Sequence, residues 1–247
     1  STIFPGSSPV SSISSNTCVA FARSVADLMD DLRTVRPTVL VSVPRIYERV
    51  YAAMHAGVAA SPAQALVLRW SESAAWRRYR RSRGEDAGRV LDGLASLAWP
   101  LFDRFVAAGV RDVFGGRLRL AVSGGAALSQ AISRCFLGFG VPVVQGYGMT
   151  ETSPVVSCNT PEDNDPASVG RLLDGVEARI GDNRELLVRG PGVMRGYWKR
   201  EAETTQAFVD GWLRTGDQAA LEAGRLRILG RVKEIIVTST GEKIAPA

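Results

Sequence analysis

The stretch that decides the fold begins with Leu118-Arg119-Leu120-Ala121-Val122, a short run rich in apolar residues that predicts a β-strand. The next residues, Ser123-Gly124-Gly125-Ala126-Ala127, are typical of a tight turn. A helix is expected after the turn, with Ser129 as its N-cap and apolar residues at helical spacing up to the glycines at 138 and 140. Val141-Pro142-Val143-Val144 then predicts a second strand that runs into Gln145.

A strand, a helix and a second strand in this order predict a right-handed parallel crossover within one sheet. The two segments that leave the strands, residues 123–128 (the first loop) and 145–152 (the second loop), are then expected at the same carboxyl edge of that sheet. Open α/β sheets bind their ligands at this edge. The sequence therefore indicates an α/β fold with a ligand site where two glycine-rich loops meet.

The second loop reads Gln145-Gly146-Tyr147-Gly148-Met149-Thr150-Glu151-Thr152, and its residue types suit a magnesium nucleotide. Gly146 and Gly148 lack the Cβ atoms that would keep phosphate oxygens from the backbone N–H groups. Tyr147 offers a flat ring for a purine, and Glu151 a hard carboxylate oxygen for Mg²⁺. On local chemistry alone a plain glycine-rich turn, with Thr150 as a cap and Glu151 as surface charge, explains the loop equally well.

With the first loop, the second loop resembles the adenylate-forming (AMP-binding) acyl-CoA synthetases. Asp210-Gly211-Trp212-Leu213-Arg214-Thr215-Gly216-Asp217 is similar to the aspartate motif of that family, and Gly230-Arg231-Val232-Lys233-Glu234 to its hinge. Arg36-Pro37-Thr38 and Val43-Pro44-Arg45-Ile46-Tyr47 resemble the long-chain fatty acid branch. The resemblance extends from about residue 25 to the end of the chain.

The resemblance implies a role for each matching residue. The wall around adenine and the acyl group would be made by Gly124, Gly125, Ala126, Gln145, Gly146, Tyr147, Gly148 and Met149, with Tyr147 stacked on the purine. The catalytic residues would be Thr150 on the α-phosphate, Glu151 on magnesium, and Arg231 at the ribose and phosphate. Asp217 would accept both ribose hydroxyls, and Lys233 would be the hinge of the C-terminal lid.

The implied activity has two steps and uses ATP, Mg²⁺ and coenzyme A. A fatty carboxylate attacks the α-phosphate to give acyl-AMP and pyrophosphate, and the thiol of coenzyme A then displaces AMP. Two parts of the family apparatus have no counterpart in this sequence: the Ser/Thr/Gly-rich phosphate loop and the lid lysine. We therefore expect an internal fragment that is inactive or binds weakly. Ala127 stands where the family usually has proline.

Two alternatives remain open at this point. The chain could belong to an adenylation module for an aryl or amino acid, which uses the same superfamily motifs. It could also be a non-catalytic remnant that binds a nucleotide or an acyl group.

The expected organisation has four parts: an atypical segment at 1–24, a partial α/β AMP-binding subdomain at 25–165, a β-rich subdomain at 166–232, and the hinge with the start of a missing lid at 233–247. Up to about residue 115 the chain is expected to be mainly helical, with one strand near 38–43 and a core stripe of Ile46, Val50, Met54 and Val58. Short, frequently turned strands after 168 predict a small barrel-like unit or a sandwich packed against the α/β layers.

Composition excludes several function classes. The chain has 247 residues, 45% hydrophobic and 22% charged, and no run near the roughly 20 apolar residues of a membrane span. Its three scattered cysteines and single histidine, His55, argue against a zinc site or a Ser/His relay and favour a cytoplasmic protein.

The net charge of +5 concentrates in Trp76–Arg83. Arginines around most of that helix favour a solvated helix end over nucleic-acid binding. A fatty substrate is consistent with weak peripheral membrane contact, and oligomeric state leaves no signal in the sequence.

Overall fold

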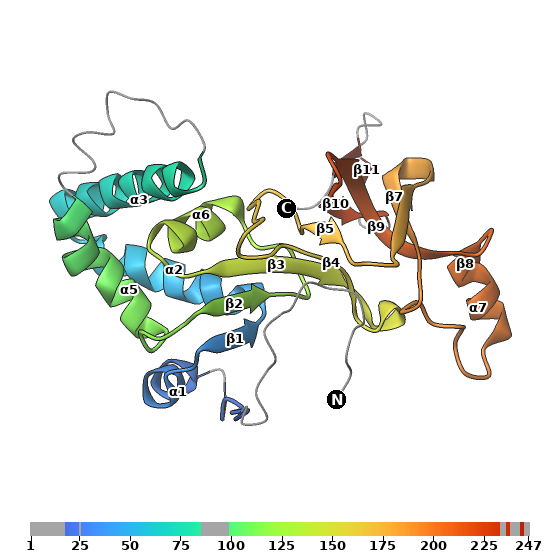
Figure 1. Ribbon diagram of the computed structural model, residues 1–247, viewed down its shortest axis with the longest axis horizontal. Helices are drawn as coiled ribbons and strands as arrows, with labels where there is room; N and C mark the ends of the chain where they lie inside the picture. The colour runs from blue at the N-terminus through green and yellow to red at the C-terminus, as the bar shows by residue number, and fades with distance from the viewer. Residues whose placement is uncertain (1–17, 25, 85–98, 233–235, 238–242, 245–247) are drawn as a thin grey trace.

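A computed structural model describes residues 18–24, 26–84, 99–232, 236–237 and 243–244. Helices gather at one end of the molecule and short strands at the other, and one sheet runs between them (Figure 1). The expectations for Lys233, for residues 1–17 and for most of 233–247 lie outside the described residues. The division into subdomains at residue 165 stays a prediction.

The parallel part of the sheet has the predicted crossover. Its strands are β1 (Val39–Ser42), β2 (Leu120–Ser123) and β3 (Val143–Gly148), and helix α6 (Gln130–Gly138) connects β2 to β3. β1 pairs with β2, and β2 with β3, both in parallel, so that Ser42, Ser123 and Gln145 lie side by side at the carboxyl edge. The convergence of the two loops on one edge is therefore confirmed.

Helices cover this part of the sheet, and prolines set where two of them begin. Pro44 starts α2, and Pro62 starts α3 after Ser61, whose side-chain oxygen accepts the N–H of Gln64. Proline suits the first helical turn because its missing N–H would have no helical partner there. The remaining bounds are α1 (Leu28–Val35), α2 (Pro44–Val58), α3 (Pro62–Ser82), the π-helix η1 (Asp103–Ala107) and α5 (Ala108–Val113).

The core of the helical end is built around three aromatic rings. Tyr47, Phe114 and Phe136 are fully buried, with ring centroids 5.5 to 6.2 Å apart. Helices α3 and α6 approach closely because residue 138 is glycine, where a Cβ would lie 2.9 Å from the Cβ of Ala75. Three residues of the predicted stripe on α2 belong to this core: Val50 is buried, and Met54 and Val58 are partly buried. Ile46, the fourth, is also buried.

Strand β3 joins the two ends of the molecule. Its first half pairs in parallel with β2, and its second half pairs antiparallel with β4, Gly146 opposite Cys158. Beyond β4 the sheet continues in the order β5, β10, β9, β7, β6. The bounds are β4 (Val155–Cys158), β5 (Arg171–Leu172), β6 (Glu177–Ile180), β7 (Glu185–Arg189), β8 (Phe208–Val209), β9 (Trp212–Glu222) and β10 (Arg225–Arg231).

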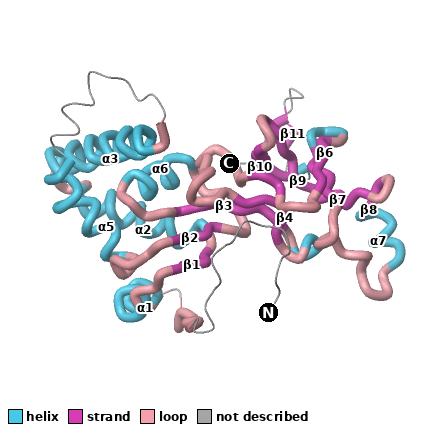
Figure 2. The backbone as a smooth tube through the Cα atoms, in the orientation of Figure 1, coloured by secondary structure: helices cyan, strands magenta, loops and turns pink. Residues whose placement is uncertain are grey.

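The expectation of a barrel-like unit is wrong, because among the described residues this sheet is open, with β1 at one end and β6 at the other (Figure 2). A second core lies under its antiparallel part and includes Val156, Leu186, Leu213 and Leu226. Strand β8 adds to β9 from the side, after helix α7 (Glu201–Ala207). A small separate ribbon pairs β11 (Ile236–Val237) with β12 (Lys243–Ile244).

The basic segment 76–83 ends α3 and is partly used in packing. Arg83 donates hydrogen bonds to the backbone carbonyls of Pro161 and Glu162, and the guanidinium of Arg78 lies 5.0 Å from the ring centroid of Trp99. Across the described part of the chain, no helix has both the length and the apolar character needed to span a membrane.

Candidate nucleotide site

The first loop presents an open backbone. A Cβ at Gly124 or Gly125 would have no atom within 4 Å, and Gly125 has a φ of 85°, which favours glycine. Ala126 and Ala127 are exposed. The N–H of Gly124 donates to the carbonyl of Ser42 at 3.1 Å, which anchors the start of the loop to β1. The exposed middle of the loop, residues 125–127, is open to a ligand.

Gln145 connects the first loop to the rest of the site. Its Oε1 accepts the backbone N–H of Leu128 at 2.9 Å, and its Nε2 donates to the carbonyl of Pro166 at 3.2 Å. The side chain is buried, so these bonds replace water. Gln145 thus fixes the end of the first loop against the 159–168 segment, a role that the sequence did not indicate.

The glycines of the second loop are explained by packing. A Cβ at Gly148 would lie 1.7 Å from the carbonyl oxygen of Pro154, and one at Gly146 would lie 3.3 Å from that of Ser157. Both positions belong to β3 and face the neighbouring strand β4. Close strand contact therefore requires glycine at 148 whether or not a phosphate approaches there.

A 3₁₀ turn, η2 (Thr150–Thr152), follows β3 and presents two of the predicted catalytic residues. Met149 is its N-cap, and the Oγ1 of Thr152 accepts the N–H of Met149 at 3.1 Å. The suggestion that Thr150 caps the segment is therefore wrong, because Thr152 supplies the capping hydroxyl. Thr150 is exposed on the turn, where a phosphate oxygen could reach it.

Glu151 is held at two points by the segment that precedes α7. Its backbone carbonyl accepts the N–H of Met194 at 2.8 Å, and its Oε1 accepts the hydroxyl of Tyr197 at 2.9 Å. Acceptor capacity remains on the carboxylate. No cluster of three acidic, cysteine or histidine side chains suited to a metal occurs in the described residues. A single carboxylate fits Mg²⁺ that is held mainly by nucleotide phosphates and water.

Three predicted residues from distant parts of the chain meet around one carboxylate. Asp217 is buried on β9; its Oδ2 accepts the hydroxyl of Tyr147 at 2.6 Å, and its Oδ1 accepts Nε of Arg231 at 3.0 Å. Arg231 lies directly opposite Asp217 in the β9–β10 ladder. Burial, and next the hydrogen bond to Asp217, raise the pKa of Tyr147 well above its usual range. The phenol of Tyr147 is therefore a neutral hydrogen-bond donor to Asp217.

Sequence reasoning missed the residues that support Asp217. Buried Glu185 accepts Nη2 of Arg214 at 2.8 Å and the backbone N–H of Gly216 at 3.2 Å. Thr215 donates to the carbonyl of Leu186 at 2.8 Å. These bonds fix the part of strand β9 that carries Asp217. The available signal was a glutamate at the start of a strand whose next three residues, 186–188, are apolar.

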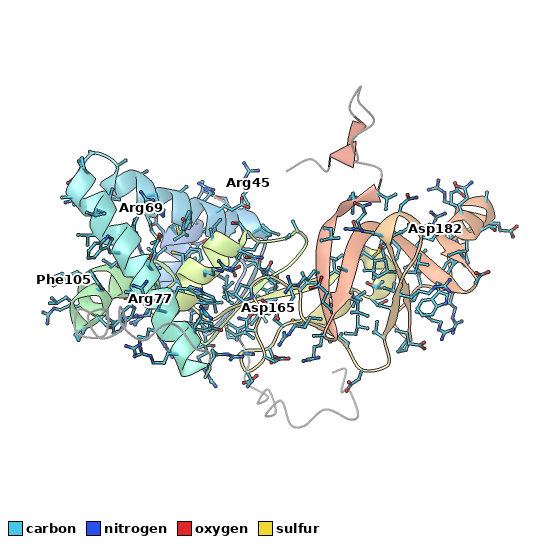
Figure 3. All side chains as sticks on the ribbon, turned by 90° about the horizontal axis from the view of Figure 1, so that it is seen from above. Arg45, Arg69, Arg77, Phe105, Asp165 and Asp182 are labelled. Atoms are coloured by element: carbon cyan, nitrogen blue, oxygen red, sulfur yellow. The ribbon has the colours of Figure 1, made fainter. Side chains whose placement is uncertain are left out.

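An apolar cavity lies away from the two loops. A cavity of about 770 Å³ opens between α1, α2, α3 and the η1–α5 segment, and none of its lining residues belongs to either loop. Val50, Met54, Val67, Phe105 and Val110 line it, with Arg33 and Gln64 as its polar members. Phe105 marks this helical end in Figure 3, with Asp165 near the middle and Asp182 at the strand-rich end.

Comparison with known proteins points to one family. The model of the family described as "AMP-binding enzyme" matches residues 10–198. The match begins before residue 25, where the sequence analysis placed the start of the resemblance. Long-chain-fatty-acid–CoA ligase FadD15 of Mycobacterium tuberculosis is 39% identical over 236 residues, covering 94% of this chain and 38% of the relative.

Two further similarities agree with the first. The peroxisomal long chain acyl-CoA synthetase 6 of Arabidopsis thaliana is 36% identical over 236 residues, covering 89% of this chain and 32% of its own. The ATP-bound RpMatB-BxBclM chimera B1 superposes with a TM-score of 0.57 at 26% identity, covering 90% of this chain and 35% of that one. The chain spans well under half the length of the curated relatives that it matches.

Proposed function

Because the chain belongs to the AMP-binding enzyme family, we propose that its two loops form part of the nucleotide site of an ATP-dependent long-chain fatty acid–CoA ligase. The observation that carries the proposal is the meeting of Tyr147, Asp217 and Arg231 around one buried carboxylate. The names of the curated relatives, long-chain-fatty-acid–CoA ligase and long chain acyl-CoA synthetase, support the substrate class.

In the proposed reaction a fatty carboxylate oxygen attacks the α-phosphorus of ATP, and pyrophosphate leaves. The thiolate of coenzyme A then attacks the acyl carbon, and AMP leaves. Open backbone in the first loop, at Gly124, Gly125 and Ala126, would lie against adenine and the acyl group. Exposed Thr150 would donate to the α-phosphate, whose oxygens gain charge in the transition state.

Nucleotide recognition would centre on Asp217. A ribose presents two adjacent hydroxyls, and a carboxylate has lone pairs for both in addition to the bonds from Tyr147 and Arg231. Arg231, exposed beyond its contact with Asp217, would reach the ribose and phosphate. Glu151 would hold magnesium, which when bound neutralises phosphate charge. Stacking of the Tyr147 ring on the purine, with Met149 beside it, remains a proposal.

The decisive test compares two aspartates of one motif. Asp217→Asn removes the buried charge, whereas Asp210→Asn changes a residue whose side chain is 82% exposed. We expect Asp217→Asn to weaken AMP binding at least about 10-fold in calorimetry, because a charged acceptor is worth about 1.5–3 kcal/mol. Asp210→Asn should bind as the parent chain does. If both variants bound AMP with equal affinity and kept the circular dichroism spectrum of the parent chain, Asp217 would not be part of the nucleotide site.

A second measurement addresses catalysis by this polypeptide. We propose that the purified chain forms negligible palmitoyl-CoA from palmitate, ATP, Mg²⁺ and coenzyme A, because neither the phosphate loop nor the lid lysine has a counterpart in its sequence. Thioester formation well above that of an Asp217→Asn preparation would overturn this part of the proposal.

The apolar cavity favours a second candidate function, acyl binding without catalysis. Its volume of about 770 Å³ lies in the range of small-molecule sites. Gly109 lines the cavity, and a Cβ there would meet no atom within 4 Å. Gly109→Phe should therefore fill the cavity and displace a fluorescent fatty acid, while AMP binding stays unchanged. Equal fatty-acid affinity in the variant would remove this candidate.

Peripheral membrane contact by the basic segment 76–83 remains part of the proposal. Arg83 is already bonded to the backbone at 161–162, which reduces the charge available to anionic lipid. A sedimentation assay with anionic vesicles would measure how strongly the remaining positive charge of this segment binds lipid.

A further inference from the structure

We propose that Tyr197 is a positioning residue that sets the orientation of the Glu151 carboxylate for its metal. This inference rests on the proposed function, in which Glu151 holds magnesium. It adds a residue that lies 46 positions away from Glu151 in the chain and outside every motif of the sequence analysis.

The segment that carries Tyr197 is fitted closely to the 3₁₀ turn η2. The N–H of Met194 donates to the carbonyl of Glu151 at 2.8 Å, and a Cβ at Gly192 would lie 2.8 Å from the carbonyl oxygen of Thr152. These contacts fix the backbone position of Glu151, but they leave its side-chain torsions free. The hydroxyl of Tyr197, 2.9 Å from Oε1, is the contact that restrains the carboxylate itself.

Tyr197 is in turn held by helix α7. Its backbone N–H donates to Oγ1 of Thr204 at 2.9 Å, and the hydroxyl of Thr204 donates to the carbonyl of Arg200 at 2.7 Å. Gly196 makes this approach feasible, because a Cβ there would lie 2.6 Å from Cγ2 of Thr204. A chain of bonds thus runs from α7 through Tyr197 to Glu151.

The contact between the Tyr197 phenol and the Glu151 carboxylate leaves room for a metal. The phenol occupies one oxygen of the carboxylate and leaves lone pairs on both for a hard cation. Fixing the orientation of a ligating carboxylate through a hydrogen bond typically changes metal affinity 10- to 100-fold. Because Tyr197 is 39% exposed, we expect the lower end of that range.

The test replaces the hydroxyl and leaves the ring. In Tyr197→Phe, the Mg²⁺ concentration that gives half-maximal ATP binding, measured by calorimetry, should rise about 10-fold. AMP binding without metal and the thermal unfolding midpoint should remain those of the parent chain. Trp198→Phe is the matched control, since Trp198 is the adjacent aromatic and is 86% exposed. It should leave all three quantities unchanged.

A double-mutant cycle with Glu151→Gln separates positioning from general effects on the fold. In the Glu151→Gln background, Tyr197→Phe should cause no further change in the magnesium requirement, because the carboxylate that it orients is gone.

The outcomes distinguish the two proposals. If the parent chain binds AMP but ATP binding has no magnesium dependence, the metal role of Glu151 fails and the inference fails with it, while the ribose site stands. If magnesium dependence is present and identical in Tyr197→Phe, only the positioning role is overturned. The positioning role would also be overturned if Tyr197→Phe raised the magnesium requirement equally in the parent chain and in Glu151→Gln. The effect would then not depend on the Glu151 carboxylate.

Discussion

The two glycine-rich loops look alike in sequence but owe their glycines to different physical causes. In the first loop, a Cβ at Gly124 or Gly125 would meet open space. In the second loop, a Cβ at Gly148 would lie 1.7 Å from the carbonyl oxygen of Pro154. Glycine in the first loop leaves room for a ligand, whereas glycine at 148 leaves room for the neighbouring strand β4.

The comparison extends to how the loops are fixed. The first loop is anchored at its ends, by Ser42 and by the side chain of Gln145, with an exposed middle. The second loop is a strand that runs into a capped turn, and it packs through Tyr147 and Met149 against the second core. A glycine-rich motif therefore does not by itself reveal whether its backbone is open. Substitutions in the two loops should therefore differ in their effects on stability and on binding.

Gly148→Ala should have the largest effect. A Cβ 1.7 Å from the Pro154 oxygen cannot be accommodated by side-chain movement, so β3 and β4 must separate locally. We expect the free energy of unfolding to fall by about 3 kcal/mol or more, as measured by urea denaturation. A loss below about 1 kcal/mol would mean that the strands relax without cost, and would remove the packing explanation.

Thr152→Val should come next. The variant keeps the shape of the side chain but leaves the N–H of Met149 without the Oγ1 that accepts it. Loss of such a partner at a buried position costs about 1–3 kcal/mol. Thr150→Val, on the same turn but exposed, is the control and should stay within about 0.5 kcal/mol of the parent chain.

Tyr147→Phe should show a pH-dependent loss. The pKa of Tyr147 is raised in the folded chain, so its contribution to stability is fully present below the unfolded value of about 10 and declines as pH rises above that value. The difference in unfolding free energy between parent and variant should therefore be constant from about pH 7 to about pH 9 and shrink at higher pH. Urea denaturation across this range measures it. If the difference in unfolding free energy instead grew at alkaline pH, the pKa of Tyr147 would be lowered by folding, contrary to this prediction.

Gly124→Ala should have the smallest effect on stability and a clear effect on binding. Its φ is not in the left-handed region and its Cβ would be free of contacts, so the unfolding free energy should change by less than about 0.5 kcal/mol. The added methyl group would instead stand where a ligand approaches. AMP affinity in calorimetry should fall several-fold. Unchanged affinity would indicate that the open backbone of the first loop does not face the nucleotide.

Much of the parallel half of the fold was predictable because its signals are local. Strand β2, helix α6 and strand β3 follow one another within 29 residues, from 120 to 148, and the handedness of the crossover places both loops on one edge. The helix after Ser129 forms as expected, although Ser129 makes no side-chain cap bond.

The strand-rich half was harder to predict. Strand β9 (Trp212–Glu222) is the longest of the described strands, and its sequence predicted only the aspartate motif that ends at Asp217. Every second residue of β9 from 213 to 219 is buried, as expected for a strand with one face on a core. Three of these positions, however, hold Thr215, Asp217 and Ala219 and not large apolar residues. The periodic hydrophobic signal was therefore weak. The expected barrel failed for a related reason: closure depends on how distant strands pair, which short strands do not specify.

By itself, the sequence determined the family, the parallel crossover, and the set of residues expected to meet a nucleotide. Only the tertiary structure decided how those residues are supported: Tyr147 on Asp217, Gln145 between the first loop and Pro166, and Tyr197 on Glu151. The reason is the distance along the chain. Contacts such as Tyr147 with Asp217, 70 residues apart, leave no local periodicity to read, and they exist only once β3 has joined the parallel and antiparallel halves into one sheet.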